Sequence, residues 1–191
     1  MFTVYEKLLT KELFHKLHER LCDEPGWKFG LVSDSENVTE NSLRIWAKDL
    51  FNDKVFTDIL FEKICDLTKL NFEMLRVYAN GQTYGLSGDL HIDEERDNHY
   101  TFLYYTNPKW LAEWGGYTIF TEMSNKIQDK LTSSNLKNNT ETINTKIFIP
   151  KPNTGILYKS NVTHAGLEPT RHCKELRITV AYKLKLKDMR D

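Results

Sequence analysis

The sequence contains no apolar run that approaches the roughly 20 residues a helix needs to span a bilayer. Its first residues, Met1–Glu6, also lack the basic and apolar regions of a secretory signal peptide. Cysteine is scarce, and Cys22, Cys65 and Cys173 lie far apart without forming a CxxC pair. We therefore expect a cytoplasmic protein with reduced thiols, no membrane partner and no thiolate metal site.

An excess of charge of either sign is missing as well. The chain has 26 Lys and Arg residues and 27 Asp and Glu residues, which gives a formal net charge of -1 at pH 7. Proteins that hold nucleic acid through its phosphates need a surplus of positive charge. The balance therefore argues against a nucleic-acid partner and disfavours a nucleic-acid demethylase among the candidate enzymes.

What is present is the composition of a folded domain. Of the 191 residues, 40% are hydrophobic and 28% are charged, which excludes a disordered or fibrous chain. The length suits one domain with a buried core. We expect a single domain over residues 1–191, in which residues 1–70 are mainly helical support and residues 72–186 form a β-rich core.

The first third of the chain shows the apolar spacing of amphipathic helices. One helix is predicted to begin after Thr10, a suitable N-cap residue, and to end near Pro25 and Gly26. Two more are predicted over about Ser42–Leu50 and Lys54–Thr68. These patterns predict packing surfaces and indicate no chemistry.

From about Leu75 onward the pattern changes to short β-rich runs separated by turns. Several strands in succession without intervening helices indicate an antiparallel sandwich or barrel, so the predicted fold class is α+β with helices packed outside the sheets. The polar stretch over about residues 124–145 is predicted to be a loop, either a lid over a substrate or plain surface. The predicted strands are Met74–Tyr78, His99–Thr106, Gly116–Glu122, Ile147–Pro150, Gly155–Tyr158 and Leu176–Leu184.

Three residues of the β half form a candidate metal site. His91 and Asp93 are two positions apart, so on an extended chain their side chains point to the same side. His164 is a third candidate ligand near the end of another predicted strand. Two imidazoles and one carboxylate are the ligand set of non-haem Fe(II) oxygenases, which leaves positions open for a co-substrate and dioxygen. An HxD triplet alone arises often by chance, and the residues that follow strengthen this interpretation.

Arg177 and Thr179 lie on one face of the last predicted strand. A guanidinium beside a hydroxyl is suited to gripping a carboxylate, because arginine offers two parallel N–H donors. An ordinary exposed strand arginine is the alternative. A buried arginine needs an anion, and a dicarboxylate ligand would supply one.

These motifs together resemble the iron(II)/2-oxoglutarate-dependent oxygenases of the prolyl-4-hydroxylase type. The resemblance covers about residues 72–186, and its strength is the fixed order of the motifs rather than any single one. They are Arg76–Tyr84 (RVYANGQTY), His91–Asp93 (HID), Tyr100–Asn107 (YTFLYYTN), Trp114–Phe120 (WGGYTIF), Pro152–Tyr158 (PNTGILY), His164–Gly166 (HAG) and Arg177–Thr179 (RIT).

The resemblance implies a double-stranded β-helix, or jelly roll, and a set of roles. It implies that His91, Asp93 and His164 bind Fe(II), and that 2-oxoglutarate chelates the metal while its distal carboxylate meets Arg177. Thr179 and the Tyr105 hydroxyl would assist Arg177, and Tyr78 would lie near the chelated end. It also implies that 2-oxoglutarate and O2 are converted to succinate and CO2 as an acceptor is hydroxylated, with ascorbate as a possible stimulant.

Several alternatives stay open at the level of sequence. Lys174 lies closer to His164 than Arg177 does and is a rival anchor for 2-oxoglutarate, although it sits beside Glu175 in an apparent turn. A zinc-dependent hydrolase could use the same His-Asp-His set but leaves Arg177 and Thr179 unexplained. A non-catalytic jelly-roll binding module is the alternative from another class. The acceptor is expected to be a peptide, with peptidyl proline a candidate, or a small molecule, and the sequence does not indicate an oligomeric state.

Overall fold

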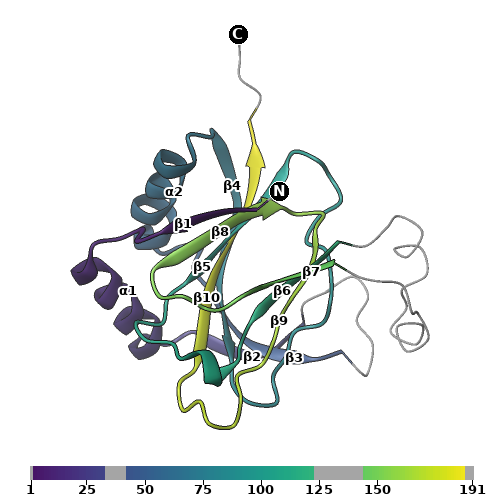
Figure 1. Cartoon of the computed structure of the whole chain (residues 1–191). Coiled ribbons are helices and arrows are strands. Elements are labelled where there is room, and N and C mark those ends of the chain that lie inside the picture. The colour runs from purple at the N-terminus through teal and green to yellow at the C-terminus, as the bar shows by residue number, and fades with distance from the viewer. Residues whose placement is uncertain (1, 33–41, 123–143, 188–191) are drawn as a thin grey trace.

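The computed structural model describes residues 2–32, 42–122 and 144–187, which form two antiparallel β-sheets and two principal helices (Figure 1). The larger sheet has seven strands in the order β1-β8-β5-β10-β4-β3-β2, and the smaller has three in the order β7-β6-β9. Every strand pairing in both sheets is antiparallel. The strands are β1 (Thr3–Glu6), β2 (Trp27–Val32), β3 (Arg44–Asp49), β4 (Phe72–Gln82), β5 (His99–Tyr105), β6 (Thr118–Glu122), β7 (Asn144–Phe148), β8 (Thr154–Lys159), β9 (Thr163–Gly166) and β10 (Arg177–Leu186).

Strand β10 shows how the larger sheet separates its two faces. Successive side chains of a strand point to opposite faces, so alternate residues share one environment. Four of them, Ile178, Val180, Tyr182 and Leu184, are buried in the main hydrophobic core. The intervening Arg177, Thr179, Ala181 and Lys183 line a cavity on the other face. One face of the sheet therefore stabilises the fold, and the other carries polar side chains into a concave space.

The helices cover the apolar face of the larger sheet, on the side away from β6 and β9 (Figure 1). Helix α1 (Lys11–Asp23) buries Phe14, Leu17 and Leu21, while α2 (Phe61–Thr68) follows a π-helical segment η1 (Val55–Leu60). A short 3-10 turn, η2 (Ala112–Trp114), precedes β6. The main core thus lies between the helices and the sheet, behind the polar cavity.

Much of the sequence prediction is confirmed, including the α+β fold class with outer helices. Helix α1 begins where Thr10 caps it, its hydroxyl accepting from the backbone N–H of Leu13 at 3.4 Å. The helix predicted over Lys54–Thr68 is present as η1 and α2. All six predicted strands are present with shifted ends, the largest change being the extension of Met74–Tyr78 to the full length of β4.

The helix predicted over Ser42–Leu50 is wrong, because this segment forms β3. Strand β3 pairs with β2 on one side and with β4 on the other, so its backbone hydrogen bonds are satisfied by neighbours distant in the sequence. Ile45 is buried while the adjacent Trp46 is 37% exposed, which is the alternation of a strand. Strands β1 and β2 also lie within residues 1–70, so this segment adds three strands to the sheet as well as helices.

Two further expectations concern the membrane and the polar loop. In the described part of the chain, no helix combines the length and the apolar character that crossing a membrane requires. Most of the predicted loop at 124–145 lies outside the described residues, and its last two residues, Asn144 and Thr145, begin β7. The prediction of a lid therefore also falls outside the described residues.

Candidate metal and dicarboxylate site

Backbone pairing brings the three candidate metal ligands together. His91 lies between β4 and β5, and it forms an isolated antiparallel bridge with His164 on β9. Its N–H donates to the His164 carbonyl at 3.0 Å, and the His164 N–H donates back at 2.9 Å. The Asp93 N–H donates to the Ser160 carbonyl at 2.8 Å, which anchors the other end of the motif. Main-chain hydrogen bonds thus bring the two halves of the site together.

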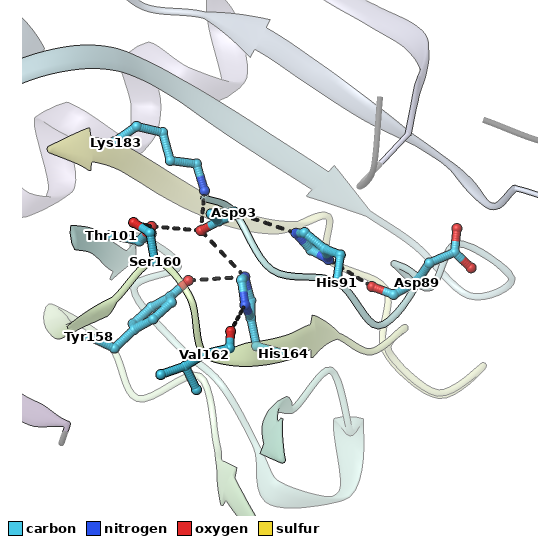
Figure 2. A network of polar contacts seen from close by, with 9 residues as sticks. All are labelled: Asp89, His91, Asp93, Thr101, Tyr158, Ser160, Val162, His164 and Lys183. Carbon is cyan, nitrogen blue, oxygen red and sulfur yellow. Dashed lines mark hydrogen bonds and ion pairs between the residues drawn. The ribbon is translucent and has the colours of Figure 1, made fainter. Parts of the chain in front are cut away.

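The ligand atoms of His91, Asp93 and His164 lie within 4.8 Å of one another (Figure 2). His91 Nε2 is 3.3 Å from Asp93 Oδ1, and His164 Nε2 is 3.7 Å from Asp93 Oδ2. The Asp93 side chain is only 4% exposed. Three ligand atoms this close together, one of them on a buried carboxylate, form a compact site for one cation.

The outer hydrogen bonds of both imidazoles fix which nitrogen faces the site. His91 Nδ1 lies 2.8 Å from the Asp89 carbonyl, and His164 Nδ1 lies 2.9 Å from the Val162 carbonyl. Because a carbonyl only accepts, each Nδ1 carries the hydrogen, and in the neutral ring each Nε2 presents a lone pair. Burial lowers the pKa of His164 to about 4, so this ring is neutral at pH 7.

A divalent metal ion fits this arrangement. Two Nε2 lone pairs and a carboxylate oxygen converge, and a cation is the partner that relieves their mutual repulsion. The carboxylate itself is ionised: burial acts to raise the pKa of Asp93, but Lys183 and the two histidines hold it well below its usual range. Neutral imidazoles oriented by carbonyls, together with one carboxylate, suit Fe(II).

Arg177 lies at another part of the same cavity and is only 2% exposed. Its Nε donates to the Gly116 carbonyl at 2.6 Å, Nη1 to Gln82 Oε1 at 2.6 Å and Nη2 to Thr118 Oγ1 at 2.9 Å. These bonds use three of the five guanidinium N–H groups and leave one on each terminal nitrogen. All three acceptors are neutral, and among the described residues no carboxylate pairs with this buried charge.

The electrostatic state of Arg177 follows from its burial. Burial lowers the pKa of its guanidinium to about 10, with the Tyr105 hydroxyl acting in the opposite direction. Arg177 is therefore still charged at neutral pH. A cation held in a cavity without a counter-ion makes this part of the cavity a binding position for an anion.

The predicted helper residues divide into two groups. Thr179 and Tyr78 line the cavity with Arg177, and the Tyr78 ring lies 4.4 Å from the Arg76 guanidinium. Tyr105 is not among the residues that line the cavity, but its hydroxyl donates at 2.8 Å to Oγ1 of Thr118, which does line it. Its ring centre is 5.9 Å from the Arg177 guanidinium, so its predicted link to Arg177 has a structural basis.

Lys174, the rival anchor, lies apart from these residues. Its side chain is exposed, and its ammonium donates to the Arg171 carbonyl at 3.4 Å. It is not among the residues that line the cavity. The structure thus brings Arg177, and not Lys174, into one space with the three metal-ligand candidates.

Several residues of the site were not singled out from the sequence. Thr118 and Gln82 both stood inside motifs that carried the family resemblance, yet neither was given a role. Lys183 stood on the last predicted strand, six positions after Arg177, and this even spacing on one face was the available signal. Thr101 and Tyr158 also stood inside quoted motifs without an assigned contact, and their hydroxyls meet Asp93 Oδ2 at 2.6 Å and His164 Nε2 at 3.1 Å.

Comparison with known proteins identifies the family. Residues 74–182, more than half of the chain, match the 2OG-Fe(II) oxygenase superfamily, and the chain belongs to this family. Fe(II) is therefore its metal and 2-oxoglutarate its co-substrate, as expected from the motifs. A comparison with curated proteins finds no match.

Solved structures show the same fold at low sequence identity. A prolyl hydroxylase from Trichoplax adhaerens, in complex with a peptide of hypoxia inducible factor, has a TM-score of 0.64 and 16% identity over 96% of this chain and 83% of that one. A prolyl-4-hydroxylase from Pseudomonas putida has a TM-score of 0.55 and 13% identity over 97% and 92%. HygX from Streptomyces hygroscopicus, with nickel, 2-oxoglutarate and hygromycin B bound, has a TM-score of 0.61 and 10% identity over 98% and 83%. The double-stranded β-helix predicted from the sequence is confirmed.

Proposed function

We propose that this chain is a dioxygenase that hydroxylates an acceptor while 2-oxoglutarate is converted to succinate and CO2. His91, Asp93 and His164 would hold Fe(II), since their three ligand atoms converge on one point. The metal, when bound, supplies activation of dioxygen at the positions that the protein leaves open. The protein contributes a fixed ligand set, ordered by carbonyl hydrogen bonds, in a largely buried pocket.

Arg177 would bind the distal carboxylate of 2-oxoglutarate. Its two remaining N–H groups, one on each terminal nitrogen, match the two oxygens of a carboxylate. Thr179 offers a hydroxyl on the same face of β10. Thr118 adds another, because its oxygen already accepts from Tyr105 and from Arg177 and its own hydrogen is free to be donated.

The observation that carries this proposal is the placement of two unlike sites in one cavity. One is the His-Asp-His cluster, and the other is a buried guanidinium with no carboxylate partner in the described part of the chain. A zinc hydrolase would need only the first. A dicarboxylate that chelates a metal through one end and needs a cation at the other uses both.

A peptidyl proline is our proposal for the acceptor. Two prolyl hydroxylases share the fold, one of them holding a peptide, and the motif series resembles this branch of the family. HygX, with hygromycin B bound, shares the fold too, so the peptide requires a direct test. The widely separated free thiols Cys22, Cys65 and Cys173 support the cytoplasmic setting predicted above.

The test is conversion of 2-oxoglutarate to succinate by the Fe(II)-loaded chain, measured with a panel of peptides. Each proline-containing peptide is paired with a peptide in which alanine replaces the proline, and the His91→Ala variant serves as the inactive control. We expect succinate from the wild-type chain and a mass gain of one oxygen on a proline peptide only. Absence of succinate with every acceptor would contradict the oxygenase, whereas hydroxylation of non-peptide acceptors alone would contradict the peptidyl proline.

A further inference from the structure

A largely buried ion pair joins Asp93, 4% exposed, to Lys183, 20% exposed, a residue that the proposed function does not use (Figure 2). The Lys183 ammonium pairs with Asp93 Oδ2, and the Thr101 hydroxyl donates to the same oxygen at 2.6 Å. Ser160 Oγ lies 3.1 Å from Thr101 Oγ1 and supports that hydroxyl. One oxygen of the metal-ligand carboxylate, Oδ2, therefore meets two donors, whereas Oδ1 meets only the His91 ring among the side chains that the structure describes.

Strand geometry explains how Lys183 reaches this position. Lys183 lies on β10, on the same face as Arg177, and its backbone partner on β4 is Arg76. Like charges directly opposite each other on one face of a sheet are destabilising. Here Lys183 turns to Asp93, while Arg76 lies over the ring of Tyr78 at 4.4 Å. The lysine is thus directed to the carboxylate from the central strand of the seven-stranded sheet.

The occupied oxygen limits how Asp93 can bind a metal. Oδ1 lies 3.3 Å from His91 Nε2 and keeps its lone pairs available, because that nitrogen carries no hydrogen in the neutral ring. If both carboxylate oxygens bound the ion, two imidazoles and Asp93 would take four positions of an octahedron instead of three. A chelating co-substrate and dioxygen together need three open positions.

We propose that Lys183 is a positioning residue that keeps Asp93 a one-oxygen metal ligand, and so reserves a coordination position for the co-substrate and dioxygen. The proposal rests on the metal site of the proposed function. It concerns the number of open coordination positions on the metal ion and not the rate of turnover. The test can therefore use a metal that is stable in air.

The experiment loads the chain with Mn(II) and counts the exchangeable water molecules on the ion by water-proton relaxation. Affinity for 2-oxoglutarate is then measured by calorimetry on the same samples. We expect about three exchangeable waters in the wild-type chain and about one fewer in Lys183→Met, in which Oδ2 loses its ammonium partner, keeps only the Thr101 hydroxyl and can also bind the ion. The same variant should bind 2-oxoglutarate roughly tenfold more weakly. Lys183→Arg, which keeps the cation, should restore both values.

Lys185→Met is the matched control, since Lys185 lies two residues further along β10, while the lysine that pairs with Asp93 is Lys183. It should keep the wild-type water count and affinity. An unchanged water count in Lys183→Met would overturn the proposal. Should that variant not fold, Lys183→Leu, which is uncharged and likewise has no hydrogen-bond donor, carries the same expectation and the same contrary outcome.

The outcomes separate this inference from the proposed function. A chain that shows the predicted water counts but forms no succinate would overturn the oxygenase and support the role of Lys183. Succinate formation together with equal water counts in wild type and Lys183→Met would support the oxygenase and overturn the role of Lys183.

Discussion

Arg177 illustrates how a single residue can indicate a missing partner. A buried charge is costly to maintain, and proteins normally offset it with an opposite charge. In the described part of this chain Arg177 meets only a backbone carbonyl, an amide oxygen and a hydroxyl. A bound carboxylate would supply the charge that these neutral acceptors do not.

Replacing Arg177 with methionine should therefore affect the co-substrate far more than the metal. We expect Arg177→Met to weaken 2-oxoglutarate binding to the Mn(II)-loaded chain by about 100-fold, because one partner of a buried ion pair is removed. Mn(II) affinity should change by no more than about threefold, since Arg177 contacts none of the three metal-ligand candidates. Calorimetry measures both, with Lys174→Met as the exposed control. Wild-type affinity in Arg177→Met and a large loss in Lys174→Met would assign the anchor to Lys174.

At the scale of residues, the sequence predicted the side chains whose chemical type and place in a motif indicate metal or carboxylate binding. His91, Asp93, His164 and Arg177 stood in motifs of fixed order, and the structure brings all four to one cavity. Gln82 and Thr118 could not be assigned from sequence, because their role lies in a hydrogen bond to an arginine on a different strand. The role of Tyr105 stays a prediction, and only the fold shows that its hydroxyl donates to Thr118, which lines the cavity.

Among the elements, β4 and β10 carry most of the site. Their register places Arg177 opposite Gln82, Thr179 opposite Asn80 and Ala181 opposite Tyr78. Both strands were predicted from their β-rich composition, and β10 was predicted almost to its ends. Strand β3 was not, because a short run with Leu43, Ile45 and Trp46 fits a helix or a strand until its neighbours are known. Pairing with β2 and β4 decides between them.

The turn before β6 supplies a test at this scale. Gly116 has φ +66°, and a Cβ added there would lie 2.8 Å from Trp110 and 3.0 Å from Arg177 Cδ. Gly116→Ala should lower the free energy of unfolding by about 1–2 kcal/mol through backbone strain alone, and it should also displace Arg177 and weaken 2-oxoglutarate binding. Urea unfolding and calorimetry measure the two effects.

Gly85 provides the matched control for this variant. It has φ +87°, but a Cβ there would meet no atom within 4 Å. Gly85→Ala should therefore lower the free energy of unfolding through backbone strain and leave the affinity for 2-oxoglutarate unchanged. Equal loss of affinity in both alanine variants would contradict a specific contact between the Gly116 turn and Arg177.

At the scale of the whole molecule, support and chemistry lie on opposite faces of one sheet. The helices pack on the apolar face, and the site lies on the other (Figure 1). The sequence predicted this division because the helical segments show the apolar spacing of packing surfaces, whereas the motifs of the metal site lie in the β-rich part. That residues 1–191 form one domain stays a prediction, and a single cooperative unfolding transition is its test.

Shortening a buried side chain between the helices and the sheet should lower the stability of the fold and leave 2-oxoglutarate binding unchanged. Leu21 of α1 is fully buried, and Leu21→Ala should lower the free energy of unfolding by about 3 kcal/mol. Affinity of the folded variant for 2-oxoglutarate should stay within about twofold, since α1 lies behind the sheet. Ile59→Ala, at a position that is 51% exposed, should change the free energy of unfolding by less than about 0.5 kcal/mol. Weaker binding of 2-oxoglutarate by Leu21→Ala, measured well below the temperature at which this variant unfolds, would contradict the separation of support and chemistry onto opposite faces of the sheet.

The most direct measurement is an anaerobic titration of the Fe(II)-loaded chain with 2-oxoglutarate, followed by visible absorption. We predict a weak charge-transfer band that saturates near one equivalent of co-substrate. The band should be absent when Zn(II) replaces Fe(II), and it should be lost in His164→Ala. A wild-type chain that shows no band at saturating co-substrate, or a band that survives in His164→Ala, would contradict a His-Asp-His centre that holds Fe(II) and 2-oxoglutarate together.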